Sequence, residues 1–248
     1  MHFFMINDLL ILVYFCLIII LQSAIGVGVL VLGTPFLLLL DYEIIEIFFI
    51  LLPISILTSL SNLLIMNFYN NFTKKSTLRE FRKFFIICIP SIMVGLVILK
   101  FFQNYINFKI LVSVVIIFSV FFVIFKDKIE FRINFFRKSI LFFVGIIHGL
   151  TNSGGTLLSL ALSTDNKKNY ARYNITLFYL ILASFQYLVT VFIFYENFIF
   201  SKNINLILVI LLGVLIGNII NNYIDNSKYK MVINILAILS SLILIFGQ

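Results

Sequence analysis

The sequence predicts an all-α integral membrane protein, and three observations carry that prediction. First, 62% of the 248 residues are hydrophobic and only 11% are charged, which is too little charge to cover a water-soluble domain of this size. Second, the apolar residues form runs close to the roughly 20 residues that cross about 30 Å of hydrocarbon. Third, most basic residues lie in short segments between these runs, where they control membrane topology.

Six of the apolar runs are predicted to be membrane-spanning helices: Ile44–Met66, Phe84–Leu99, Phe108–Phe125, Ile175–Tyr195, Ile204–Ile220 and Met231–Phe246. Two further stretches, Leu9–Leu40 and Ile140–Leu162, are predicted to be broken helices. The first is long for one span and short for two complete spans with a turn. The second is interrupted midway by glycine and asparagine residues. One long tilted helix at each place is the alternative.

The distribution of basic residues favours re-entrant hairpins at the two broken stretches. If each stretch enters and returns on the same side, with the N-terminus outside, fifteen of the eighteen Lys and Arg residues face the cytoplasm. If each stretch crosses once, the best orientation puts eleven inside and seven outside. The positive-inside rule therefore prefers the hairpins. Tyrosines near the predicted span ends serve as interfacial anchors: Tyr42, Tyr69, Tyr105, Tyr170, Tyr195, Tyr223 and Tyr229.

This topology predicts two matching halves within a single membrane domain, residues 1–130 and residues 131–248. Each half consists of a broken hairpin followed by three spans. Because three crossings is an odd number, the second half is inverted relative to the first. Broken helices at matching places of inverted halves point to the binding site of a transporter.

Composition and motifs exclude several other classes of protein. The net charge of +8 is explained by short topology-setting loops and by anionic lipid headgroups, so no nucleic-acid partner is expected. The two cysteines, Cys16 and Cys88, lie inside apolar runs and are expected to pack there without a metal or redox role. The chain has no phosphate-binding G-x-x-x-x-G-K-[ST] motif. We therefore expect no cofactor.

The two broken stretches carry related glycine-rich motifs. The first contains Gly26 and Gly28, then Thr34 and Pro35, followed by an apolar run. The second contains Gly145, Gly149, Gly154 and Gly155, arranged as a G-x-x-x-G-x-x-G-G-like segment. Together with the size and the duplicated layout of the chain, these motifs resemble those of the sulfite exporter TauE/SafE family of membrane transporters. Val29 and Leu30 stand where the fuller motif has glycines, and Asn152 replaces another glycine.

The resemblance implies transport of a small anion, with sulfite and sulfonates as the named examples, in the bacterial inner membrane. The expected partners are this anionic substrate, the lipid bilayer and, as a coupling ion, the proton. The sequence is compatible with a homo-oligomer without specifying one.

The residues around the breaks suit an anion. A half-helix that begins after a break offers free N–H groups and the positive end of its dipole, and glycine allows a ligand to approach the backbone. Thr and Asn side chains add neutral donors. The predicted substrate-binding residues are Gln22, Gly26, Gly28, Thr34, Pro35, His148, Gly149, Thr151, Asn152, Ser153, Gly154, Gly155 and Thr156.

Several of these polar and small residues also have purely structural interpretations. His148 could carry a proton coupled to anion movement, or it could be a neutral cap of the broken helix. Asn62 and Gln186 either line the pathway or bond across helices, and packing between helices is favoured for both. Gly213 and Gly217 are expected to permit close helix packing.

Two other functions compete with transport. A non-transporting scaffold or assembly subunit is the main alternative, although two matched backbone breaks would serve no purpose in a scaffold. An intramembrane enzyme would need a catalytic constellation, and His148 near Ser153 has no carboxylate beside it in the sequence. We therefore expect a secondary transporter and not an enzyme.

Overall fold

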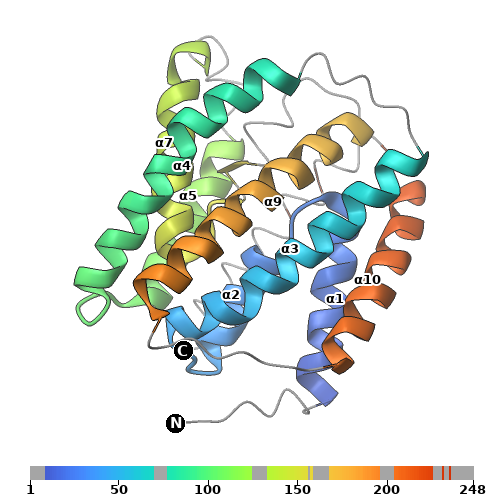
Figure 1. The fold of residues 1–248 in the computed structure, drawn as a ribbon, viewed down its shortest axis with the longest axis horizontal. Coiled ribbons are helices and arrows are strands. Elements are labelled where there is room, and N and C mark those ends of the chain that lie inside the picture. Colours follow the sequence, from blue (N-terminus) through green and yellow to red (C-terminus); the bar gives the residue numbers. More distant parts are fainter. Residues whose placement is uncertain are drawn as a thin grey trace.

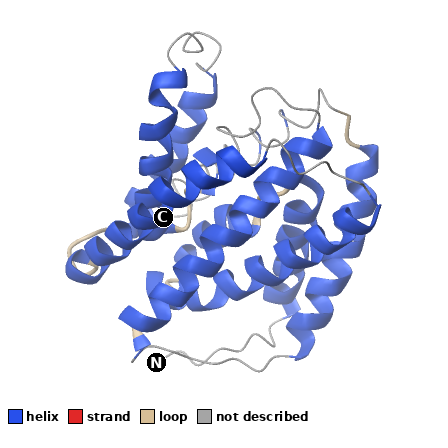
Figure 2. Cartoon of the chain, turned by 45° about the horizontal axis from the view of Figure 1, so that its top comes forward, coloured by secondary structure: helices blue, strands red, loops and turns tan. Residues whose placement is uncertain are grey.

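The structure is a computed structural model that describes residues 9–69, 77–124, 133–155, 157–158, 168–195, 204–225, 231 and 235. Within these residues the regular structure is entirely helical (Figure 2). The helices, in chain order, are α1 (Leu9–Ile25), α2 (Val29–Leu39), α3 (Ile44–Tyr69), α4 (Thr77–Phe102), α5 (Phe108–Ile124), α7 (Ile133–Thr151), α9 (Lys168–Ile193) and α10 (Ile204–Tyr223).

Four helices are long and apolar enough to cross a membrane: Ile44–Phe68, Phe84–Phe102, Lys168–Ile193 and Asn205–Tyr223. They coincide with four of the six predicted spans and confirm the helical membrane class. A fifth predicted span corresponds to α5, an apolar helix of 17 residues. The sixth, Met231–Phe246, lies outside the described residues apart from Met231 and Ile235.

The two halves of the chain interlock. Helices α3 and α9, each of 26 residues, lie side by side at the centre and run in opposite directions (Figure 1). Around them, α1 of the first half packs against α10 of the second, and α7 of the second half packs against α4 of the first. Each half therefore completes its packing with a helix of the other half.

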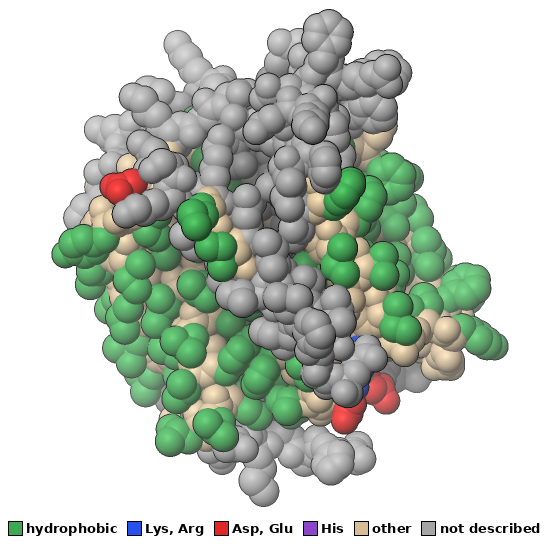
Figure 3. All heavy atoms as spheres, turned by 180° about the vertical axis from the view of Figure 1, so that it is seen from behind, with side chains coloured by type: hydrophobic (Ala, Val, Ile, Leu, Met, Phe, Trp, Pro, Cys, Tyr) green, Lys and Arg blue, Asp and Glu red, His purple; other side chains and the backbone are tan. Residues whose placement is uncertain are grey.

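The outer surface is strongly apolar. Helices α4, α5 and α10 expose large hydrophobic side chains, and Figure 3 shows such side chains covering much of one face. Soluble monomers rarely expose contiguous apolar patches of this extent, so lipid is the natural environment of this surface. The exposed residues on these three helices include Ile86, Met93, Ile110, Val114, Phe118, Leu208, Leu212, Leu215 and Ile219.

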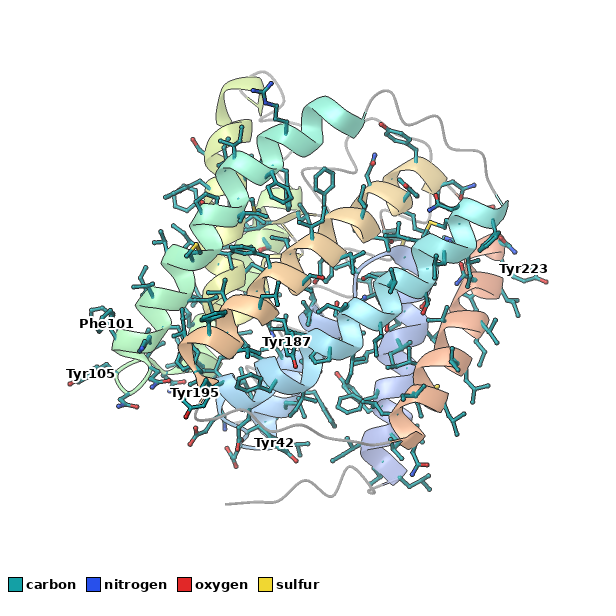
Figure 4. All side chains as sticks on the ribbon, in the orientation of Figure 1. Tyr42, Phe101, Tyr105, Tyr187, Tyr195 and Tyr223 are labelled. Carbon is teal, nitrogen blue, oxygen red and sulfur yellow. The ribbon has the colours of Figure 1, made fainter. Side chains whose placement is uncertain are left out.

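Aromatic side chains mark two opposite ends of the bundle. Figure 4 places Tyr42, Tyr105 and Tyr195 at the left and lower left of the molecule and Tyr223 at its right-hand edge. Burial, followed by the negative charge of Glu46, raises the pKa of Tyr42. This arrangement matches the predicted interfacial anchors at these four positions.

Glycines allow the helices of the two halves to approach closely. A Cβ on Gly217 would lie 2.5 Å from the carbonyl oxygen of Ile20 in α1, which confirms packing as the role of this glycine. In the corresponding contact between α4 and α7, a Cβ on Gly149 would lie 2.5 Å from the carbonyl oxygen of Ile92 and 3.2 Å from Gly95 Cα. The structure thus places Gly149, a predicted site residue, in a helix crossing.

Gly149→Ala is expected to lower stability by about 1–3 kcal/mol, because the added methyl group meets backbone that cannot rotate away. The measurement is the thermal unfolding midpoint of the detergent-purified protein. Gly33→Ala is the matched control, since its Cβ would meet the flexible Leu51 methyl groups at 2.9 Å and should cost less. Equal midpoints for Gly149→Ala and the wild type would contradict the packing role.

Candidate functional site

The first break turns the chain back on itself. Helix α1 ends at Ile25, and Gly26 adopts a φ of 97°, a conformation that glycine tolerates far better than other residues. Beyond the turn, Gly28 packs so closely on α1 that a Cβ there would lie 2.9 Å from Gln22 N. Tyr14 donates a hydrogen bond to the carbonyl oxygen of Leu32, at 2.9 Å. The stretch Leu9–Leu40 is therefore a hairpin of two helices, not one long helix.

Gln22 closes the first break with a full set of hydrogen bonds. Its side-chain oxygen accepts from the backbone N–H of Val29, the first residue of α2, at 3.0 Å. Its amide nitrogen lies 3.1 Å from Ser59 Oγ and 3.3 Å from Ser55 Oγ of α3. The Gln22 side chain is fully buried. It joins the start of α2 to α3 and has little freedom to rearrange.

The other predicted residues of the first stretch lie away from the turn. Thr34 and Pro35 are inside α2, about 9 Å beyond Gly28 along the helix axis at 1.5 Å per residue. Both are buried, and the Thr34 hydroxyl has no hydrogen-bond partner among the described residues. The structure does not bring these two residues to the turn.

The second break follows α7, which ends at Thr151. Asn152 has a φ of 59°, in the left-handed region that asparagine adopts more readily than most residues, and its N–H donates to the carbonyl oxygen of His148 at 2.9 Å. The Thr151 hydroxyl donates to the carbonyl oxygen of Ile147 and accepts from Ser153 N, so both hydroxyl-bearing residues hold the turn. Thr156 lies outside the described residues.

The two breaks share one geometry. A Cβ on Gly154 would lie 2.8 Å from His148 Cβ and 2.6 Å from the carbonyl oxygen of Val144. These neighbours precede Gly154 by six and ten residues, as Gln22 and Ile18 precede Gly28. In each break, the residue two positions before the glycine has a positive φ. His148 thus occupies in the second half the place that Gln22 occupies in the first.

Helix α9 supplies the neighbours of the second break. The His148 and Tyr179 rings meet edge to face with centroids 6.0 Å apart. Gly155 lies against the Tyr179 hydroxyl so tightly that a Cβ would overlap it. Gln186 Nε2 donates to Asn152 Oδ1 at 2.8 Å. All four of these polar side chains are fully buried.

Much of the hydrogen-bonding capacity of this cluster is unused. Within the described part of the chain, five buried atoms of these four residues have no hydrogen-bond partner: His148 Nδ1 and Nε2, Asn152 Nδ2, Tyr179 Oη and Gln186 Oε1. Leaving such groups unsatisfied away from water costs about 1–3 kcal/mol each. A ligand that satisfied them would be stabilised by the same groups.

Arg172 is a buried basic residue beside the first break. It lies before the predicted span Ile175–Tyr195, among the basic residues expected between the spans, but α9 begins at Lys168 and carries Arg172 into the bundle with 5% exposure. Its guanidinium donates to the carbonyl oxygen of Ser23 and, at 2.7 Å, to Asn218 Oδ1. Asn218 in turn donates to Asn62 Oδ1, and Asn62 donates to Ser23 Oγ. This network ties together α1, α3, α9 and α10, and it confirms that Asn62 bonds across helices.

Sequence reasoning missed Tyr179 and Arg172 as neighbours of the breaks and favoured packing between helices for Gln186. The signal for Gln186 was its polarity within an apolar run, and its bond to Asn152 confirms that it bonds across helices. Tyr179 had no such signal, because tyrosine fits an apolar run as well as phenylalanine does. Arg172 could have been noticed as lying only three residues before the predicted span.

The fold defines a helical membrane protein whose buried centre holds two matching helix breaks. In a comparison with protein-family models, residues 10–244 match the sulfite exporter TauE/SafE family. Because this match covers nearly the whole chain, the protein belongs to that family of membrane transporters. Comparisons with curated proteins and with solved structures gave no match.

Proposed function

We propose that this protein is a secondary transporter that moves a small anion, sulfur-containing as in sulfite or a sulfonate, across the cytoplasmic membrane. Family membership supports the class of function. The observation that supports the site is the buried polar cluster at the second break, where His148, Asn152 and Tyr179 leave hydrogen-bonding atoms without a partner among the described residues. Non-helical backbone at membrane depth is tolerated where protein or a water-filled cavity surrounds it, and a transport pathway provides such a setting.

The proposal includes inverted repeats. The matching geometry of the two breaks, the antiparallel central pair of α3 and α9, and the crossed packing of α1 on α10 and α7 on α4 support this symmetry. Two halves of opposite orientation around one site allow alternating access by rocking of one half against the other. In keeping with the orientation that the basic residues favour, we place the edge that holds Tyr42, Tyr105 and Tyr195 outside the cell.

The topology makes a prediction about chemical labelling. Tyr105 and Tyr223 are 85% and 81% exposed and lie at opposite ends of the bundle. In a background in which Cys16 and Cys88 are replaced by alanine, Tyr105→Cys should react with a membrane-impermeant maleimide in intact cells. Tyr223→Cys should react only after permeabilisation. Labelling of both positions from the same side would contradict the inverted arrangement.

Proton coupling through His148 forms part of the proposal. The imidazole is buried in the second break and has no hydrogen-bond partner among the described residues, so capping of the helix by this side chain has no support in the contacts. Its position next to Asn152 and Tyr179 suits a group that gains a proton only together with an anion. A transport rate that does not change with pH in the wild type would remove this part of the proposal.

The test of the proposed function is uptake by purified protein in proteoliposomes. Sulfite, sulfate, methanesulfonate and small carboxylates are presented in turn, with and without a pH gradient. The proposal expects saturable uptake of one class of anion. If protein shown to be folded moves none of these anions, the result contradicts transport of these anions and favours a scaffold or assembly subunit.

A further inference from the structure

The two breaks differ in how far their buried polar groups are satisfied. In the first break, Gln22 uses both ends of its amide, on Val29 N and on the serines of α3. The unpartnered side-chain atoms among the described residues of the first half are the hydroxyls of Thr34 and Thr58. Both lie within helices, where rotation can bring a threonine hydroxyl to the carbonyl oxygen of the preceding turn.

The second break leaves more of its buried polar atoms without a hydrogen-bond partner among the described residues. His148, which takes the place of Gln22, donates to none of the described residues and accepts from none of them through its ring nitrogens. Asn152 Nδ2, Tyr179 Oη and Gln186 Oε1 are equally unpartnered, and Thr190 Oγ1 follows Gln186 one helical turn later. All five side chains are fully buried. The two breaks share a backbone geometry, but they differ in hydrogen bonding. Gln22 at the first break is hydrogen-bonded at both ends of its amide, whereas the polar side chains at the second break leave several atoms without a partner among the described residues.

The unpartnered set at the second break, which consists of His148, Asn152, Tyr179 and Gln186, includes both donors and acceptors. Asn152 and Gln186 bond to each other through one amide nitrogen and one amide oxygen. Whichever way the two amides are oriented, the pair leaves one NH₂ donor and one carbonyl acceptor unused. Tyr179 adds a hydroxyl, and a neutral His148 adds one donor and one acceptor. A singly charged sulfur oxyanion, such as methanesulfonate, can accept from these donors, and hydrogensulfite can in addition donate its O–H group to the unused carbonyl.

The set contains no Lys, Arg, Asp or Glu side chain, and His148 adds at most one positive charge when it takes up a proton with the anion. The nearest buried cation described on α9, Arg172, precedes Tyr179 by seven residues, about 10 Å along the helix, and its guanidinium binds α1 and α10. The Born cost of removing an ion from water rises with the square of its charge. Neutral donors can offset this cost far more readily for a single charge than for a double charge.

We propose that the transported anion binds at the second break alone, through His148, Asn152, Tyr179 and Gln186, and that the site selects singly charged sulfur oxyanions over doubly charged ones. The first break then acts as a rigid counterpart, held by Gln22. This inference rests on the proposed function for its substrate class, but binding can be measured without transport.

The charge selectivity is tested by isothermal titration calorimetry on the detergent-purified full chain. Methanesulfonate carries one charge, and sulfate carries two near neutral pH. The inference expects methanesulfonate to bind at least about tenfold more tightly than sulfate, a difference of about 1.4 kcal/mol. Equal or tighter binding of sulfate, or binding of neither anion, would overturn it. If methanesulfonate binds selectively but no anion enters proteoliposomes, the inference stands and the proposed transport fails.

The location of the site is tested with matched variants in the same titration. Tyr179→Phe removes only the hydroxyl and should weaken methanesulfonate binding by about tenfold or more, as expected for a lost hydrogen bond to a charged ligand. Tyr187→Phe, the same change on the same helix where Tyr187 packs on Phe49, should bind as the wild type does. Ser59→Ala, which removes a contact of Gln22 at the first break, should also keep its affinity. Wild-type affinity in Tyr179→Phe, or an equal loss in Ser59→Ala, would overturn the proposed location.

Discussion

Replacing Gly155 with alanine is expected to abolish transport and to lower the stability of the protein. The added methyl group would overlap the hydroxyl and the ring of Tyr179, whose side chain is fully buried. Overpacking of this kind costs about 1–3 kcal/mol and sometimes more. The thermal unfolding midpoint in detergent and anion uptake in proteoliposomes measure the two effects separately.

A second substitution separates the steric effect from the loss of function. In a Tyr179→Ala background the overlap is absent, so adding Gly155→Ala should lower the unfolding midpoint less than it does in the wild type, as a double-mutant cycle measures. Transport should not recover, because the Tyr179 hydroxyl is part of the proposed binding cluster. If Gly155→Ala alone transports and melts like the wild type, the close contact between the second break and α9 is wrong.

Arg172→Gln is expected to have the second largest effect on stability, about 2–4 kcal/mol. The substitution removes a buried guanidinium that donates to Ser23 O and Asn218 Oδ1, and hydrogen bonds from charged groups contribute about 1.5–3 kcal/mol each. It also takes a positive charge from the C-terminal turn of α1, where the helix dipole favours cations. The unfolding midpoint of the purified variant measures the loss.

Lys109→Gln provides the comparison for Arg172→Gln. Lys109 pairs with Asp41 at 2.8 Å, but the Lys109 and Asp41 side chains are 32% and 83% exposed. Exposed pairs of this kind contribute about 0–1 kcal/mol, so this variant should melt close to the wild type. A Lys109→Gln loss equal to that of Arg172→Gln would show that the buried network does not hold the four helices together.

The helical class and the first break were predictable because each depends on local chemistry. Runs of apolar residues determine the spans, and the length of Leu9–Leu40 together with Gly26 and Gly28 indicates a turn within it. The structure shows that turn at the predicted glycines, with the positive φ at Gly26 that favours a residue without a side chain. At the second break Asn152 takes the left-handed position instead, in keeping with the tolerance of asparagine for it.

The composition of the polar cluster was not predictable, because it depends on how distant helices pack. Tyr179 looks like any other residue of an apolar span, and only the crossing of α9 over the second break brings it to Gly155 and His148. Gly149 shows a second limit of the motif. It lies in the motif, yet its missing side chain serves the contact with α4. A motif identifies glycines without saying which partner each one accommodates.

The central claim is that the protein carries an anion through alternating access, and counterflow tests it most directly. Proteoliposomes that contain the purified protein are loaded with unlabelled sulfite and diluted into a trace of labelled sulfite. A carrier exchanges the two pools, so the label should accumulate transiently above its external concentration, and Gly155→Ala should abolish this overshoot. Equilibration of the label without an overshoot would indicate a pore, and no entry of the label would contradict transport altogether.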